Sequence, residues 1–147
     1  MNNDMPAFDQ FMKDRELAAQ AFVNGATGPL RDIATETSPG TFFGPDGDYV
    51  DGADRVFSRY ERDAGLFESG TTDFEILQAA ASGDLAFWVG FQRATVRLRA
   101  TKEEVTFNLR VTELFRREDN GWKLIHRHAD SMRSGSHSHV GQTAQAE

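Results

Sequence analysis

The sequence contains no cysteine. It therefore cannot form disulfides or thiolate zinc sites, and it cannot use a cysteine nucleophile. It also has no apolar run near the length of about 18 residues that a membrane-spanning helix needs. Residues 1–6 lack the basic-then-apolar order of a signal peptide. We therefore expect a cytoplasmic protein without a membrane segment.

The sequence also has fewer basic than acidic residues. The chain has 16 Lys and Arg against 23 Asp and Glu, which gives a formal net charge of −7. An acidic domain without a basic cluster is poorly suited to bind nucleic acids or anionic membranes. The sequence has no glycine-rich phosphate loop and no Gly-x-Ser-x-Gly nucleophile motif. We expect no cofactor, no nucleic-acid partner and no membrane partner.

Twelve phenylalanines among 147 residues can build one sizeable core. Over residues 6–24, apolar side chains recur every three or four positions, which predicts an amphipathic helix. Arg15 is the only polar residue in this apolar stripe. Further helices are predicted at 30–37 and 53–64, and short strands at 41–43 and 49–52. The stripe consists of Phe8, Phe11, Met12, Arg15, Ala18, Ala19 and Phe22.

The second half of the chain changes to strand-like alternation. Short turns separate four such runs, which predicts an antiparallel meander. The helices would cover one face of this sheet, giving an α+β cone with a pocket inside. We expect a single domain over residues 1–133 and a disordered polar tail over 134–147. The four predicted strands are 71–81, 84–98, 105–118 and 122–130.

Glu113 is the strongest candidate for a catalytic residue. It shares the alternation of Val111 and Phe115, so it should point to the interior of the sheet. A carboxylate in an apolar cavity has a raised pKa, which suits a general acid or base. The alternative is that Glu113 lies at the rim of the cone or forms an ion pair with an arginine. Arg127 is the partner that we favour, followed by His128.

The last predicted strand offers two different faces to Glu113. His126 and His128 lie on one face, and Arg127 lies on the other. An even-numbered hairpin loop would place Glu113 with the histidines, and an odd-numbered loop would place it with Arg127. Two histidines at this spacing can chelate a metal ion, but no third ligand of a suitable type is evident. We therefore expect no metal site.

Several segments resemble the nuclear-transport-factor-2-like superfamily. The resemblance is to its SnoaL-like branch, which includes the association domain of calcium/calmodulin-dependent kinases, and it covers roughly residues 6–132. It implies a cone-shaped curved antiparallel sheet, wrapped by three N-terminal helices and enclosing a pocket. Members range from isomerases, dehydratases and cyclases to assembly domains without activity. The segments are Phe43-Gly44-Pro45, Tyr49-Val50-Asp51-Gly52, Ser82-Gly83-Asp84-Leu85-Ala86 and residues 110–130, which end in Trp-x-x-x-His-x-His.

The resemblance also orients the pocket. In the association domains, basic pocket residues occupy the positions that match Gln92, Glu113 and Ala129. Ala129 alternates with Arg127, so the resemblance implies that Arg127 faces Glu113 and that the two histidines face outward. Because the three matching positions here carry an amide, a carboxylate and a methyl group, we expect a neutral or weakly polar ligand.

Trp88 and Gln92 lie on the second long strand, on a face that the resemblance turns inward. Gln92 can donate and accept hydrogen bonds, so it is a candidate for orienting a carbonyl or hydroxyl group. Trp88 is a candidate ligand contact, with core packing as the alternative. Gly90, between them, would leave room for a ligand or for a close side chain.

Two functions remain open at this point. The first is an isomerase, dehydratase or cyclase that transfers protons on a small, largely apolar substrate. In it, Glu113 is the acid or base, and Gln92 or Arg127 orients the substrate. The second is a non-catalytic module that binds a small ligand or dimerises. In either case we expect a homodimer through the outer sheet face, which carries Phe87, Val89, Phe91 and Leu114.

Overall fold

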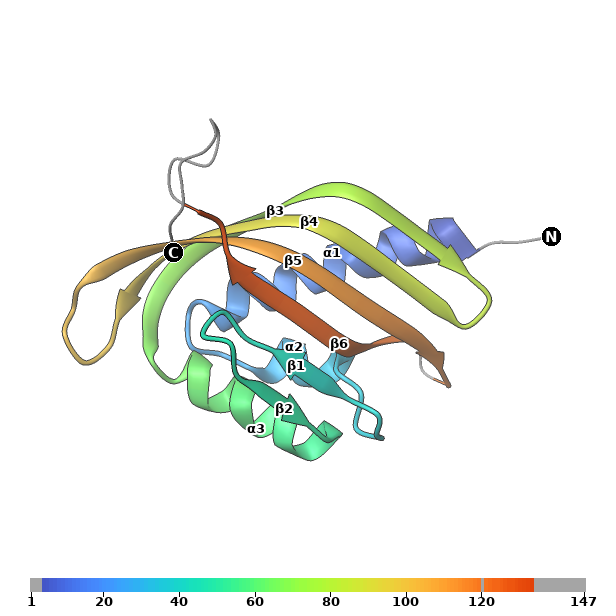
Figure 1. Cartoon of the computed structure of the whole chain (residues 1–147), viewed down its shortest axis with the longest axis horizontal. Helices are drawn as coiled ribbons and strands as arrows, with labels where there is room; N and C mark the ends of the chain where they lie inside the picture. Colours follow the sequence, from blue (N-terminus) through green and yellow to red (C-terminus); the bar gives the residue numbers. More distant parts are fainter. Residues whose placement is uncertain (1–3, 120, 134–147) are drawn as a thin grey trace.

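The structure, a computed structural model, describes residues 4–119 and 121–133. A six-stranded curved sheet, open at its edges, carries the helices against one face (Figure 1). The α+β architecture with N-terminal helices is confirmed, whereas the tail predicted at 134–147 lies outside the described residues. The strands are β1 (Thr41–Phe43), β2 (Tyr49–Asp51), β3 (Phe67–Ser82), β4 (Leu85–Leu98), β5 (Glu104–Glu118) and β6 (Gly121–Ser131).

The four long strands form the predicted meander. Each of β3, β4, β5 and β6 pairs antiparallel with the next one along the chain. β3 begins at Phe67 rather than at the predicted position 71, because its first residues pair with the end of β4. The strands are long enough that the sheet bends over the helices.

The short hairpin of β1 and β2 is part of the same sheet. The sequence predicted it as a separate unit between the helices, but β1 pairs parallel with β6. The resulting strand order is β2-β1-β6-β5-β4-β3. Without β1, β6 would be an edge strand with unpaired backbone groups. The pairing places Phe42 beside Arg127, next to the interior of the cone.

Three helices cover the concave face, as predicted. They are α1 (Asp4–Phe22), α2 (Gly28–Ile33) and α3 (Ala53–Ala64). The second helix is shorter than the predicted range 30–37, because Ala34 is already extended and forms a bridge to Leu124 of β6. α1 lies across the long strands, and α3 lies beside the β1–β2 hairpin (Figure 1). The apolar stripe of α1 faces the sheet, and its polar member, Arg15, is buried with it. No helix of the described residues is long and apolar enough to cross a membrane.

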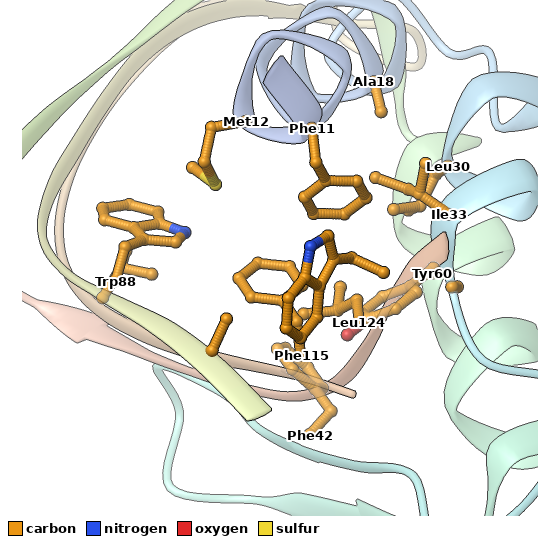
Figure 2. Packing of buried hydrophobic residues seen from close by; sticks show 14 of the residues in the cluster. Phe11, Met12, Ala18, Leu30, Ile33, Phe42, Tyr60, Trp88, Phe115 and Leu124 are labelled. Carbon is orange, nitrogen blue, oxygen red and sulfur yellow. The ribbon is translucent and has the colours of Figure 1, made fainter. Parts of the chain in front are cut away.

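Aromatic side chains close one end of the cone. Figure 2 shows Phe11 and Met12 directed from α1 toward Phe115 on the sheet, with Trp88 on the neighbouring strand. The Phe115 ring lies 5.1 Å from the ring of Phe11 and 5.4 Å from that of Phe8. These rings fill the half of the sheet that surrounds the β3–β4 turn. The open space of the cone therefore lies toward the opposite ends of the long strands.

Candidate functional site

A register shift between β5 and β6 decides which side chains face the interior. The connection between these strands is even-numbered, and alone it would place Glu113 opposite His126. The pairing of β6 skips Ile125, however, and this bulge reverses the alternation on the rest of the strand. Glu113 therefore pairs with Arg127, as the family resemblance implied.

Glu113 is fully buried and accepts four hydrogen bonds. Arg15 donates to it twice, from Nε to Oε1 at 2.9 Å and from Nη2 to Oε2 at 2.7 Å. Arg127 Nη1 donates to Oε2 at 2.7 Å, and Trp88 Nε1 donates to Oε1 at 2.8 Å. The carboxylate is thus paired with two guanidinium groups, one from α1 and one from β6. We call these residues, Glu113, Arg15, Arg127 and Trp88, the Glu113 cluster.

Arg15 is the member of this cluster that sequence reasoning did not identify as a site residue. Only 4% of it is exposed. Its position in the apolar stripe of α1 was the available signal, since a buried arginine needs an anionic partner. Glu113 was the carboxylate predicted on an inward-facing stripe, but nothing local to either residue connects the first helix to the fifth strand.

The two arginines keep Glu113 ionised. Burial raises the pKa of its carboxyl group, but the charges and hydrogen bonds of Arg15 and Arg127 outweigh burial and lower the pKa from 4.5 to about 2. Glu113 is therefore an anion at neutral pH, with little tendency to take up a proton. The predicted cationic partner is confirmed, and the predicted rise in pKa does not occur.

Beside the cluster lies a cavity of about 440 Å³, between α1, α3 and the inner face of the sheet. This volume falls in the range of about 300–1,000 Å³ that is typical of small-molecule sites. Much of its wall is apolar, and its polar groups include Arg15, Tyr60, Gln92 and Arg127. Glu113 is not among the lining residues, because the arginines lie in front of it. The apolar wall includes Ala19, Phe22, Val23, Phe67, Leu98 and Phe107.

Tyr60 brings a hydroxyl group to this cavity from α3. The residue is only 4% exposed, and none of the described residues hydrogen-bonds its hydroxyl group. Burial raises the pKa of Tyr60 well above its ordinary value, so the hydroxyl keeps its proton and can donate a hydrogen bond to a ligand. The sequence placed Tyr60 on a buried helix face but gave no reason to single out its hydroxyl group.

Arg127 and Gln92, two of the predicted ligand-binding residues, lie together on the cavity wall. Arg127 Nη2 donates to Gln92 Oε1 at 2.6 Å, and Gln92 Nε2 donates to Thr72 Oγ1 at 3.1 Å. This chain fixes the Arg127 guanidinium between Glu113 and Gln92. Its orientation is therefore set by two strands before any ligand binds.

The other predicted ligand residues lie elsewhere. Trp88 packs against Phe74, with 4.6 Å between the ring centroids, and is separated from the cavity. His126 and His128 lie on the outer face of β6, because of the bulge, and both pack against Phe43. His126 Nδ1 lies 2.7 Å from Thr41 Oγ1. The structure thus brings neither histidine nor the tryptophan to the cavity.

Among the described residues, no group of three or more His, Asp or Glu side chains has a geometry that could hold a metal ion. The mouth of the cavity carries charges of both signs instead. Arg59 pairs with Asp48 at 2.7 Å and with Asp63 at 2.9 Å, and it lies over the ring of Phe42. The mouth is therefore charge-balanced by local ion pairs, unlike the inner end of the cavity.

Solved structures with the same fold span nearly the whole chain. An NTF2-like superfamily protein from Salmonella enterica superposes with a TM-score of 0.78 at 14% identity, over 95% of this chain and 98% of that chain. A proposed dehydratase of the NTF2-like family from Streptomyces avermitilis superposes with a TM-score of 0.72 at 17% identity, over 88% of this chain and 98% of that chain. A proposed calcium/calmodulin-dependent protein kinase II association domain from Xanthomonas campestris superposes with a TM-score of 0.66 at 15% identity, over 85% of this chain and 86% of that chain.

At these identities the solved structures establish the fold alone. No curated protein sequence matches the chain. The family model of the SnoaL-like domain matches residues 17–133, which include α2, α3, every strand and all of the cavity's polar groups except Arg15. The chain therefore belongs to the SnoaL-like domain family, and its fold is that of the NTF2-like structures above.

Proposed function

We propose that the protein binds a small, largely apolar molecule in the cavity beside the Glu113 cluster. The ligand carries a hydrogen-bond acceptor that lies against Arg127 and Tyr60. The observation that carries this proposal is the Tyr60 hydroxyl, a donor on the cavity wall that none of the described residues uses. The residue is only 4% exposed, and its hydroxyl is not among the fully buried atoms that lack a partner, so the hydroxyl opens onto the cavity, where an acceptor on a ligand can pair with it.

In this proposal Glu113 is a positioning residue. It lies behind the arginines, outside the cavity wall, and holds Arg127 by a 2.7 Å ion pair. Arg127 in turn contacts the ligand. For Glu113 to act as the acid or base that we expected from the sequence, ligand binding would have to draw Arg127 away from it.

Proton-transfer catalysis is the second candidate function. Arg127 carries a positive charge, and the Tyr60 hydroxyl can donate a hydrogen bond. Both groups could stabilise negative charge on a carbonyl oxygen. Such stabilisation is what an isomerase, dehydratase or cyclase needs when a proton leaves the neighbouring carbon. The proton would go to the Glu113 carboxylate, after ligand binding has drawn Arg127 away from it. The dehydratase proposed among the solved structures of the same fold is consistent with this candidate.

Binding of 4-phenylbutan-2-one in D2O tests both candidates. We expect the ketone to bind wild-type protein, and Tyr60→Phe to weaken binding about 2- to 10-fold through the loss of one hydrogen bond. The stability of the Tyr60→Phe variant should stay unchanged, because the hydroxyl has no partner among the described residues. Binding is measured by calorimetry, and exchange of the protons beside the carbonyl by NMR.

Tyr49→Phe is the matched control, since Tyr49 is an exposed residue of β2 outside the cavity. It should leave ketone binding unchanged. Protein-dependent proton exchange would favour the catalytic candidate, and binding without exchange would favour the non-catalytic one. Equal effects of the two tyrosine substitutions would contradict the proposed site.

We also propose that the protein is a homodimer through the outer face of the sheet. On this face, Phe87 of β4 lies opposite Leu114 of β5, and Val89 and Phe91 continue the apolar row. Leu114 is 39% exposed, and Leu85 beside it is 59% exposed. Contiguous apolar surface of this kind marks interaction sites in soluble proteins. One structure of the same fold is a proposed association domain, which is consistent with self-association.

Light scattering should give twice the chain mass of 16.4 kDa at micromolar concentration. Leu114→Glu should shift the mass to that of one chain, because a buried unpaired carboxylate costs several kcal/mol at an apolar interface. Ser58→Glu, on the exposed side of α3, is the control and should leave the mass unchanged. A wild-type mass of 16.4 kDa would contradict this proposal.

A further inference from the structure

The Glu113 cluster carries more positive than negative charge. Arg15 and Arg127 provide two guanidinium groups, and Glu113 provides one carboxylate. Arg15 and Glu113 are deeply buried and Arg127 is mostly buried: the exposed fractions of their side chains are 5%, 0% and 13%. The cluster therefore has a net charge of +1, and an uncompensated charge in a low-dielectric interior is costly.

This excess charge faces the cavity. Both arginines line the cavity, whereas Glu113 lies behind them and does not. At the mouth, Arg59 and Arg62 are neutralised by ion pairs with Asp48 and Asp63. The lining as a whole has four arginines and two aspartates, in a chain whose formal net charge is −7. The cavity is thus a positive region within an acidic protein, and the imbalance lies at its inner end.

Hydrogen-bond donors remain unused at the same end. Each guanidinium has five N–H groups, and the bonds found among the described residues use two in Arg15 and two in Arg127. The Tyr60 hydroxyl is a further unused donor on the same wall. Burial raises the pKa of this hydroxyl, whereas the positive charges of Arg127 and Arg15 lower it. The two arginines are therefore close enough to the hydroxyl to affect its pKa.

The size of the imbalance limits the charge of the ligand. A single negative charge brings the cluster to neutrality, whereas a dianion such as a phosphate monoester would leave a buried negative excess. The rest of the wall is mainly apolar, with Phe22, Val23, Phe67, Leu98 and Phe107 around the space. A ligand that fits both parts has one singly charged acid group and an apolar body.

Building on the proposed function, we propose that the ligand is a monoanion, an aryl or alkyl carboxylate or a comparable acid, bound end-on. Its acid group accepts hydrogen bonds from Arg127, Arg15 and Tyr60, and its apolar body lies toward Phe67 and Phe107. This replaces the neutral or weakly polar ligand that we expected from the sequence. That expectation was based on the side chains at three strand positions, Gln92, Glu113 and Ala129. It did not include the charge of Arg15 on α1.

The test compares three molecules of the same shape by calorimetry at pH 7: 4-phenylbutanoate, 4-phenylbutanamide and 4-phenylbutylamine. We expect the carboxylate to bind at least about tenfold more tightly than the amide, because charge-assisted hydrogen bonds are about twice as strong as neutral ones. The amine should not bind, since it adds a cation beside two arginines. This comparison uses wild-type protein only and so does not depend on a variant that folds.

Arg127→Met should remove the preference for the carboxylate, because it brings the cluster to neutrality. Amide binding should weaken about 2- to 10-fold, through the loss of one hydrogen bond. Arg55→Met is the matched control: Arg55 is exposed on α3, and its loss changes the net charge equally without touching the cavity. It should preserve the preference.

The outcomes separate the two proposals. If the amide binds as tightly as the carboxylate, the monoanion proposal is overturned while the cavity remains a ligand site. A carboxylate preference that survives Arg127→Met would likewise overturn it, because the charge would then be recognised elsewhere. If none of the three molecules binds, the proposed function fails, and the monoanion proposal fails with it.

Discussion

Glu113→Gln is expected to lower the free energy of unfolding by about 3–5 kcal/mol, although the side chain keeps its shape. The substitution removes the carboxylate that lies between Arg15 and Arg127, whose guanidinium groups both donate to it at 2.7 Å. Breaking a buried ion pair on one side leaves uncompensated charge, and here two cations would remain. Urea unfolding at pH 7 measures the change.

The control for this substitution is Glu61→Gln. Glu61 also pairs with an arginine, Arg31, at 3.0 Å, but both side chains are about half exposed. Its loss should cost less than about 1 kcal/mol. The double variant Glu113→Gln with Arg15→Met should recover part of the lost stability, because only one cation then remains. A cost below about 1 kcal/mol for Glu113→Gln would contradict the ion-pair role.

The same ion pairs give the wild-type protein a defined response to acid. The pKa of Glu113 is lower in the folded protein, at about 2, than its ordinary value of 4.5. The stability that Glu113 contributes is therefore complete above about pH 5 and is lost as the pH falls toward 2. Between these values, the unfolding free energy of Glu113→Gln should depend less steeply on pH than that of the wild type.

Gly90→Ala is expected to destabilise the protein by about 3 kcal/mol. A Cβ atom at this position would collide with the carbonyl oxygen of Glu75 and would lie 3.1 Å from the Cα atom of Ile76. Both are backbone atoms of β3, at the bulge where this strand bends against β4. Backbone cannot yield as a flexible side chain can, so the cost lies at the upper end of the range for overpacking. The close approach at Gly90 is thus made by a neighbouring strand and not by a ligand.

Gly28→Ala is the control for Gly90→Ala. Gly28 is the first residue of α2, and no atom lies within 4 Å of the Cβ position. This change should alter stability by less than about 0.5 kcal/mol. Thermal and urea unfolding of both variants provide the measurement, and a similar small effect at Gly90 would contradict the tight packing of β3 against β4.

Local periodicity was enough to predict most of the fold. The α3 helix occurs over the predicted range 53–64, and the alternation of β5 correctly turned Glu113 inward. Which side of β6 faces Glu113 depends on a bulge at one extra residue, Ile125. The length of the hairpin loop does not reveal this bulge. The site as a whole could not be predicted, because Arg15 reaches Glu113 only after distant parts of the chain have packed together.

The Glu113 cluster also has a consequence for the order in which the protein assembles. Arg15 and Glu113 are separated by 98 residues, and Arg127 follows on the last strand of the sheet. Contacts between such distant positions form only after large loops have closed, which makes them late and slow. During synthesis, α1 and most of the sheet leave the ribosome before the strand that carries Arg127. A nascent chain that lacks β6 therefore has no complete Glu113 cluster, so the ligand that we propose would stabilise only the finished fold.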